Sequence, residues 1–78
     1  MTRAKIGKSP VQFDVVALLT DRPSDKLERG QVGTIVDLPG PESAFVEFAD
    51  DNGVPYALIA CPLADLIVLR YVPKAVPA

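Results

Sequence analysis

Few residues in this sequence carry enzyme chemistry. It contains no histidine and a single cysteine, Cys61. A Ser–His or Cys–His pair, in which the imidazole takes the proton of the nucleophile, is therefore excluded. A zinc site would have one cysteine and carboxylates only, too few of the usual ligands. Carboxylates remain, but a chain of 78 residues offers little enclosed volume in which to desolvate two of them. We expect no catalytic, cofactor-binding or metal-ligating residue, and hence no enzyme.

Cys61 itself is flanked by apolar residues, in the stretch from Leu58 to Leu63. No lysine or arginine lies close to it in sequence to stabilise a thiolate. We therefore predict a buried thiol that packs as a small hydrophobic side chain. A lone cysteine also excludes a disulfide within the chain.

Two glycine-containing stretches have structural explanations. Gly30 and Gly33 stand three residues apart, which predicts a sharp chain reversal followed by a close backbone approach. They form no phosphate-binding loop, which needs a longer glycine-rich segment with a lysine. Residues 50–53 (Asp-Asp-Asn-Gly) lack the alternating ligands and distant glutamate of an EF-hand. Their Asn-Gly pair instead predicts a β-hairpin turn.

The segment from Thr20 to Gly30 is long, polar and rich in charge. Long polar loops on a rigid scaffold often contact ligands. We predict a partner-binding site in this loop, formed by Arg22, Lys26, Glu28 and Arg29. The mixed charges are equally compatible with a solvated loop that binds nothing.

The charge is distributed unevenly along the chain. The formal net charge is −2, yet residues 1–10 carry three basic residues and no acid. Residues 11–69 carry all ten acids and only three bases. Nucleic-acid affinity rests mainly on neutralising phosphates, so an acidic body argues against a nucleic-acid partner. We expect another protein as the partner, of undefined identity.

The N-terminus has no apolar h-region of a secretory signal. The longest apolar runs, such as residues 15–19 and 66–69, are too short to span a bilayer. We expect a cytoplasmic protein with no membrane partner.

The body consists of short apolar runs separated by Gly, Pro, Asn and Asp, with almost no helix signals. Strands are predicted at residues 13–19, 31–38, 43–48, 54–60 and 66–71. Residues 62–65 predict a single 3₁₀ turn. Together these features predict an all-β fold, a small five-stranded SH3-like barrel. An OB-like barrel normally has a helix between its third and fourth strands, where this sequence has a tight turn.

Strand periodicity also predicts which side chains share a face. Ala44, Val46 and Phe48 should lie together, and Tyr56 should share a face with Leu58. Residues 39–41 (Pro-Gly-Pro) should end the second strand. The last run is too apolar to alternate, which is typical of a strand covered on both faces.

Three regions follow from these patterns. Residues 1–10 are predicted to be a flexible basic tail, residues 11–71 the SH3-like β-barrel, and residues 72–78 an extended proline-containing tail. A core this small can be supplemented by a partner or by oligomerisation. The sequence does not define the oligomeric state.

The stretch from Gly30 to Val36 resembles the start of a KOW motif, found in SH3-like domains of ribosomal and transcription proteins. That resemblance implies contact with RNA. KOW proteins tend to carry Lys or Arg beside the glycines, whereas this chain has Gln31, Thr34 and Asp37.

A wider resemblance extends from Phe13 to Leu69. The residues that carry it are 14–18 (DVVAL), 27–36 (LERGQVGTIV), 46–48 (VEF), 51–53 (DNG) and 56–58 (YAL). In these the chain resembles the small bacterial proteins of the uncharacterised domain family 4926. The resemblance implies an SH3-like module, in some members encoded as in toxin–antitoxin pairs, and supplies no site residues.

The leading hypothesis is a small non-catalytic protein-binding module, antitoxin-like or an accessory subunit of a complex. One alternative is a KOW-like RNA-binding or ribosome-associated protein. Another is an accessory subunit that resembles the SH3-like part of nitrile hydratase.

Overall fold

The computed structural model describes residues 9–70. The elements, in chain order, are β1 (Val15–Leu18), the 3₁₀ turn η1 (Pro23–Asp25), β2 (Val32–Gly40), β3 (Ser43–Ala49), β4 (Pro55–Pro62), the 3₁₀ turn η2 (Leu63–Asp65) and β5 (Leu66–Val68). The fold is all-β, as predicted, and no α-helix occurs between residues 9 and 70. None of the helical turns in this part of the chain could cross a bilayer. The predicted tails lie almost wholly outside the described residues.

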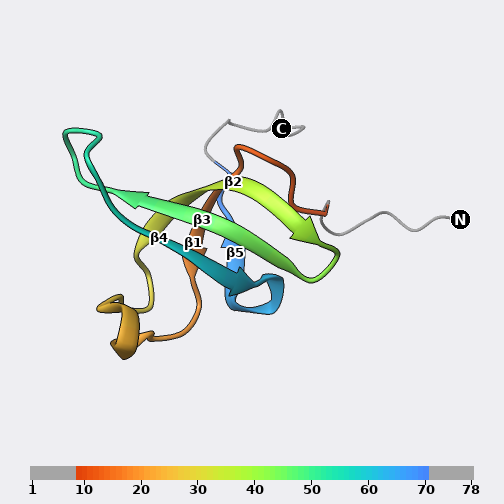
Figure 1. The fold of residues 1–78 in the computed structure, drawn as a ribbon, viewed down its shortest axis with the longest axis horizontal. Helices are drawn as coiled ribbons and strands as arrows, with labels where there is room; N and C mark the ends of the chain where they lie inside the picture. Colours follow the sequence, from red (N-terminus) through yellow and green to blue (C-terminus); the bar gives the residue numbers. More distant parts are fainter. Residues whose placement is uncertain (1–8, 71–78) are drawn as a thin grey trace, which may run out of the picture.

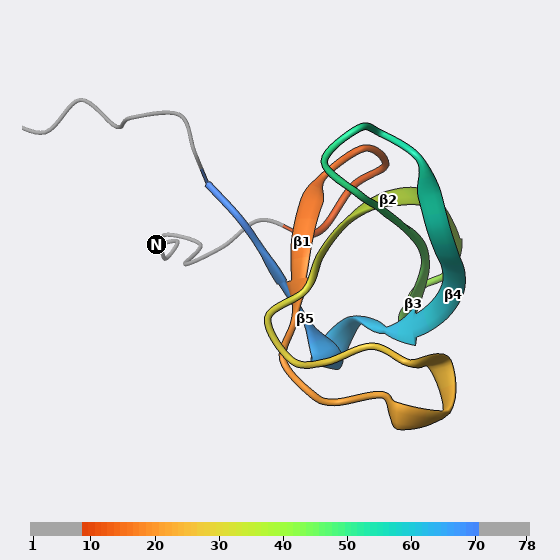
Figure 2. The ribbon, with the colours of Figure 1, turned by 90° about the vertical axis from the view of Figure 1, so that its left-hand side faces the viewer.

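All five strands form one antiparallel sheet in the order β4-β3-β2-β1-β5. The strands are labelled in Figure 1, and Figure 2 shows that the sheet bends strongly, with β4 and β1 on opposite sides of the molecule. In the described part of the chain β4 and β5 do not pair with each other and remain the two sheet edges. The barrel closure expected from the sequence is therefore not confirmed.

The predicted hairpin turn joins β3 to β4. The Asp50 carboxylate accepts hydrogen bonds from the Asn52 and Val54 amides at 2.9 and 3.0 Å. Gly53 has φ +80°, a conformation that glycine adopts without strain. The predicted 3₁₀ turn is also present, as η2 between β4 and β5.

The core lies on the concave side of the bent sheet. Ala44, Val46 and Phe48 are all fully buried, which confirms the predicted face of the third strand. The predicted burial of Cys61 is confirmed as well. The close approach at Gly33 is present, because a Cβ there would lie 2.7 Å from the Val46 side chain and 2.9 Å from the Glu47 carbonyl oxygen.

Three strand predictions were wrong in detail. The second strand continues through Pro39 and Gly40, with register shifts against β3. This is tolerated because β1 pairs only with residues 32–34 of β2, so Pro39 needs no amide on that side. The last strand is not covered on both faces, since Ile67 at the sheet edge is 48% exposed. Phe13 lies before the first strand, in a turn with φ +75°.

Candidate functional site

The predicted site is the loop between β1 and β2, which is folded back on itself. Arg22 and Leu27 pair as an isolated antiparallel bridge, with reciprocal backbone hydrogen bonds of 2.8 and 3.1 Å. Turn η1 fills the space between them, and Pro23 at its start fixes the backbone φ. The Leu27 side chain is only 2% exposed and belongs to the hydrophobic core. The loop is thus anchored to the sheet by an apolar side chain at its centre.

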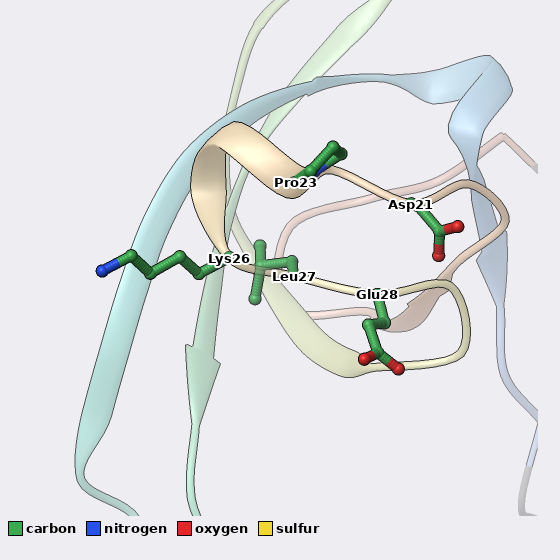
Figure 3. A pocket seen from close by; sticks show the side chains of 5 residues that line it. All are labelled: Asp21, Pro23, Lys26, Leu27 and Glu28. Carbon is green, nitrogen blue, oxygen red and sulfur yellow. The ribbon is translucent and has the colours of Figure 1, made fainter.

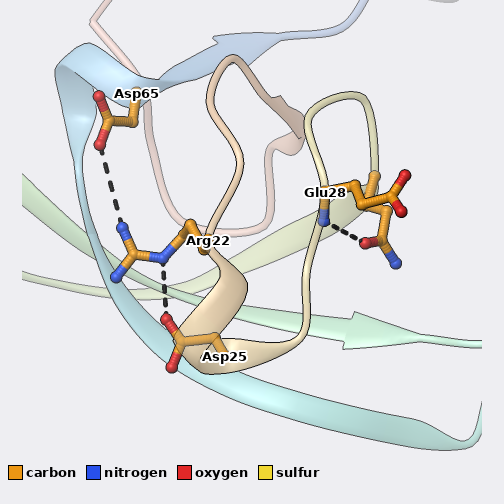
Figure 4. Close-up of polar contacts among 5 residues, drawn as sticks. Arg22, Asp25, Glu28 and Asp65 are labelled. Carbon is orange, nitrogen blue, oxygen red and sulfur yellow. Dashed lines mark hydrogen bonds and ion pairs between the residues drawn. The ribbon is translucent and has the colours of Figure 1, made fainter.

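Arg22 ties the loop to the far end of β4. Its Nε donates to Asp25 Oδ2 at 3.0 Å, and its Nη1 lies 4.0 Å from Asp65 Oδ2 in η2. The guanidinium lies between the two carboxylates (Figure 4). All three side chains are partly buried, which protects the ion pairs from screening by salt more than at a fully exposed site. Arg22 therefore acts within the fold and offers little of its charge to a partner.

Every backbone amide from Asp25 to Gln31 donates a hydrogen bond. Five of the seven bond to backbone carbonyls. The other two bond to side chains, the Glu28 amide to Gln31 Oε1 (Figure 4) and the Arg29 amide to Asp21 Oδ1 at 2.9 Å. A loop with its donors satisfied internally loses little conformational freedom when it binds.

A shallow pocket of about 490 Å³ opens on this loop, lined by Asp21, Pro23, Lys26, Leu27 and Glu28. Its floor is apolar where Leu27 enters the core. In Figure 3 the Asp21 and Glu28 carboxylates stand at its rim, while the Lys26 side chain extends away from them. The pocket offers mixed charge around a small apolar floor and no enclosed volume.

The four predicted site residues do not share one role. Lys26, Glu28 and Arg29 are exposed on the loop, whereas Arg22 is half-buried and ion-paired. Lys26 has φ +61°, a left-handed conformation that ends η1 and turns its side chain outward. All four thus lie on the β1–β2 loop, and three of them are exposed. Their contact with a partner stays a prediction.

Burial raises the pKa of the Cys61 thiol. The Arg22 guanidinium partly offsets this effect, and the Asp65 and Asp25 carboxylates reinforce it. A raised pKa keeps the thiol protonated and unreactive at neutral pH. Within residues 9–70, no three Cys, Asp or Glu side chains gather into a group able to hold a metal ion.

Sequence reasoning missed a second feature, an apolar strip on the outer face of the β3–β4 hairpin. Phe45, Tyr56 and Leu58 are 38%, 50% and 61% exposed there. Tyr56 also accepts a hydrogen bond from Gln31 Nε2 at 3.0 Å, which links the hairpin to the end of the loop. The signal was present in the periodicity, which placed Tyr56 and Leu58 together without identifying their face as the outer one.

The family model described as Domain of unknown function (DUF4926) matches residues 12–68. The chain belongs to this family. The match spans all five strands, the loop and the hairpin, so these features lie within the family domain. No curated protein and no solved structure matches the chain.

Proposed function

We propose that this DUF4926 protein is a non-catalytic protein-binding module, a small accessory subunit of a complex. The observation that carries the proposal is the β1–β2 loop, whose amides from Asp25 to Gln31 are all hydrogen-bonded while Lys26, Glu28 and Arg29 are exposed. Preorganised loops of this kind bind partners at low entropic cost. These bonds hold the backbone of a loop that carries exposed charges of both signs, which suits recognition of a protein surface.

The partner surface extends beyond the loop itself. A stable interface buries roughly 800 Å² on each partner, more than one small loop supplies. The Gln31–Tyr56 hydrogen bond places the exposed Tyr56 ring beside the loop, and tyrosine is enriched at interfaces. Lys26, Glu28 and Arg29 would then form the polar rim and Tyr56 an apolar contact.

We also propose that the five-stranded sheet has an SH3-like arrangement. Five short strands, a long first loop and a 3₁₀ turn before the last strand support an SH3-like arrangement, here with β4 and β5 left open as edges. Binding loops on such small β-folds are positioned by the rigid sheet.

The test is capture of the partner from the lysate of the native organism by the tagged protein, with and without nuclease. A stoichiometric protein that survives nuclease supports the proposal. The double variant Lys26→Glu/Arg29→Glu should reduce capture at least tenfold, while the control Arg70→Glu, outside the loop, should not. Capture of ribosomal proteins that disappears with nuclease would favour the RNA-binding alternative instead.

A further inference from the structure

Within residues 9–70, strand β4 is an edge of the sheet. It pairs with β3 on one side only. The Leu63 amide donates to the Glu42 carbonyl at 2.8 Å, so these two residues form a hydrogen-bonded pair at the end of the β3–β4 ladder. Because hydrogen-bonded and non-hydrogen-bonded pairs alternate in an antiparallel ladder, Cys61 and Ile59 bond to β3. Leu58 and Ala60 therefore direct their N–H and C=O groups away from β3, and no backbone partner for their amides occurs among residues 9–70.

Prolines limit this edge at both ends. Pro55 and Pro62 begin and end β4 and have no amide to donate. The segment able to accept another strand is thus short and centred on Ile59, with Leu58 and Ala60 on either side. Figure 2 shows β4 on the opposite side of the molecule from β1 and β5, and the Leu58 and Ala60 residues are exposed.

The outer face beside the edge has a defined shape. Leu58 lies opposite Glu47, and Ala60 lies opposite Phe45, in the β3–β4 register. Ala60 is small and exposed, so the Phe45 ring is open to a side chain that reaches across it. On this outer face Leu58 thus lies opposite a charged side chain, and Phe45 lies opposite a small one.

The sequence that contains β2 to β5 carries charge of one sign. Residues 30–69 contain six acidic residues and no lysine or arginine: Asp37, Glu42, Glu47, Asp50, Asp51 and Asp65. Of these, Asp65 is near Arg22. Glu47 lies opposite Leu58, so a strand added beside Leu58 meets a negative field that attracts a basic segment and repels an acidic one.

The geometry points to β4 as a docking edge for an extended, cationic segment of a partner protein, added as a sixth strand. The inference deepens the proposed function by naming the partner's chemistry at a second surface. Neighbouring strands lie about 4.8 Å apart, so a side chain opposite Leu58 starts about 10 Å from Glu47. An arginine there reaches the carboxylate with its stem lying over Leu58. A large apolar residue opposite Ala60 packs onto Phe45. The segment thus carries an apolar and a basic residue two positions apart.

A second copy of this chain fits the edge less well. Pairing centred on Ile59 would bring together two halves that each carry only acidic charge between residues 30 and 69. Like charges placed across an interface disfavour association. The same field favours the basic strand.

The probe is an acetylated, amidated heptapeptide of threonines with isoleucine at position 3 and arginine at position 5. Titration into ¹⁵N-labelled protein should shift the Leu58 and Ala60 amides. Methylating the isoleucine and arginine nitrogens removes the hydrogen bonds to β4 and should weaken binding at least tenfold. Glutamate in place of arginine should weaken it by a similar factor.

Matched variants separate the edge from the fold. Ala60→Pro removes an edge amide that the β3–β4 ladder does not use and should abolish the shifts, whereas Ala60→Thr keeps the amide and should bind. Glu47→Lys should reverse the preference between the arginine and glutamate peptides. Equal binding of the two peptides by the unmodified chain, or no shifts at millimolar peptide, overturns the inference. So does a dimer in sedimentation that Ala60→Pro dissociates, because the occupant is then a second copy. Capture of a partner through the loop would survive each of these failures.

Discussion

The β1–β2 loop and strand β4 differ in how completely their backbone amides are hydrogen-bonded. The loop has no regular strand, yet all seven amides from Asp25 to Gln31 are hydrogen-bonded within the protein. Strand β4 is regular, yet Leu58 and Ala60 direct their amides away from the sheet. In the described part of this protein the irregular loop has its amides fully hydrogen-bonded, whereas the regular strand does not. A strand needs another strand on each side to pair all of its backbone groups, whereas a folded loop can form these hydrogen bonds within itself.

The two regions also differ in charge. The loop mixes Arg22, Lys26 and Arg29 with acidic residues, and part of this charge is neutralised in ion pairs. Residues 30–69, which include β4, contain six acidic residues and no lysine or arginine. The loop therefore suits a mixed polar surface, and the edge suits a basic strand. The Gln31–Tyr56 hydrogen bond links the end of the loop to the start of β4.

The largest expected effect tests the anchor of the loop. Leu27→Ala should lower the free energy of unfolding by about 2–5 kcal/mol, because it empties a fully buried site in a small core. Urea unfolding measures this change. The control Leu19→Ala, at an exposed position, should cost less than about 1 kcal/mol. Equal effects would mean that the loop is not held by its apolar centre.

A smaller effect tests the contact of β2 with β3. Gly33→Ala should cost about 1–3 kcal/mol, since its Cβ would meet the Glu47 carbonyl oxygen, a backbone atom that cannot move freely. Gly40→Ala, in the same strand, has nothing within 4 Å of its Cβ and should be nearly neutral. Thermal unfolding of the two variants side by side distinguishes the sites. A neutral Gly33→Ala would show that β2 and β3 separate more easily than the structure indicates.

Cys61 lies in β4, and its pKa depends on Arg22 and Asp25 of the loop. Its pKa is raised in the folded state, so it contributes stability that is fully present below the unfolded value, 9.0. This contribution is lost as the pH rises through the folded pKa. Urea unfolding between pH 8 and 10.5 should therefore show a steeper loss for the wild type than for Cys61→Ala. Identical slopes would contradict the raised pKa.

The smallest expected effect concerns the ion pairs of Arg22. Arg22→Ala should cost no more than about 1 kcal/mol of stability, because the pairs remain partly exposed. It should nevertheless raise the pKa of Cys61 further, since the Arg22 guanidinium lowers this pKa. Thiol alkylation as a function of pH measures this shift. A fall in the pKa would contradict the arrangement of charges in Figure 4.

Much of the fold was accessible from sequence because it depends on local rules. Asn52-Gly53 fixes a hairpin, alternation places Ala44, Val46 and Phe48 inward, and apolar neighbours bury Cys61. The predicted loop site was located, but the ion pair of Arg22 with Asp65 could not be foreseen, because 43 residues separate the two. The free edge of β4 likewise depends on the order of strands in the sheet, which local periodicity does not encode.

Amide hydrogen exchange of the free protein, read residue by residue, tests the contrast between loop and edge most directly. The amides of Asp25 to Gln31 should be protected from exchange despite lying in an irregular segment. Along β4, Ile59 and Cys61 should be protected and Leu58 and Ala60 should exchange at least tenfold faster. Uniform protection along β4 would show that the edge is already occupied. Unprotected amides throughout the loop would show that it is not preorganised.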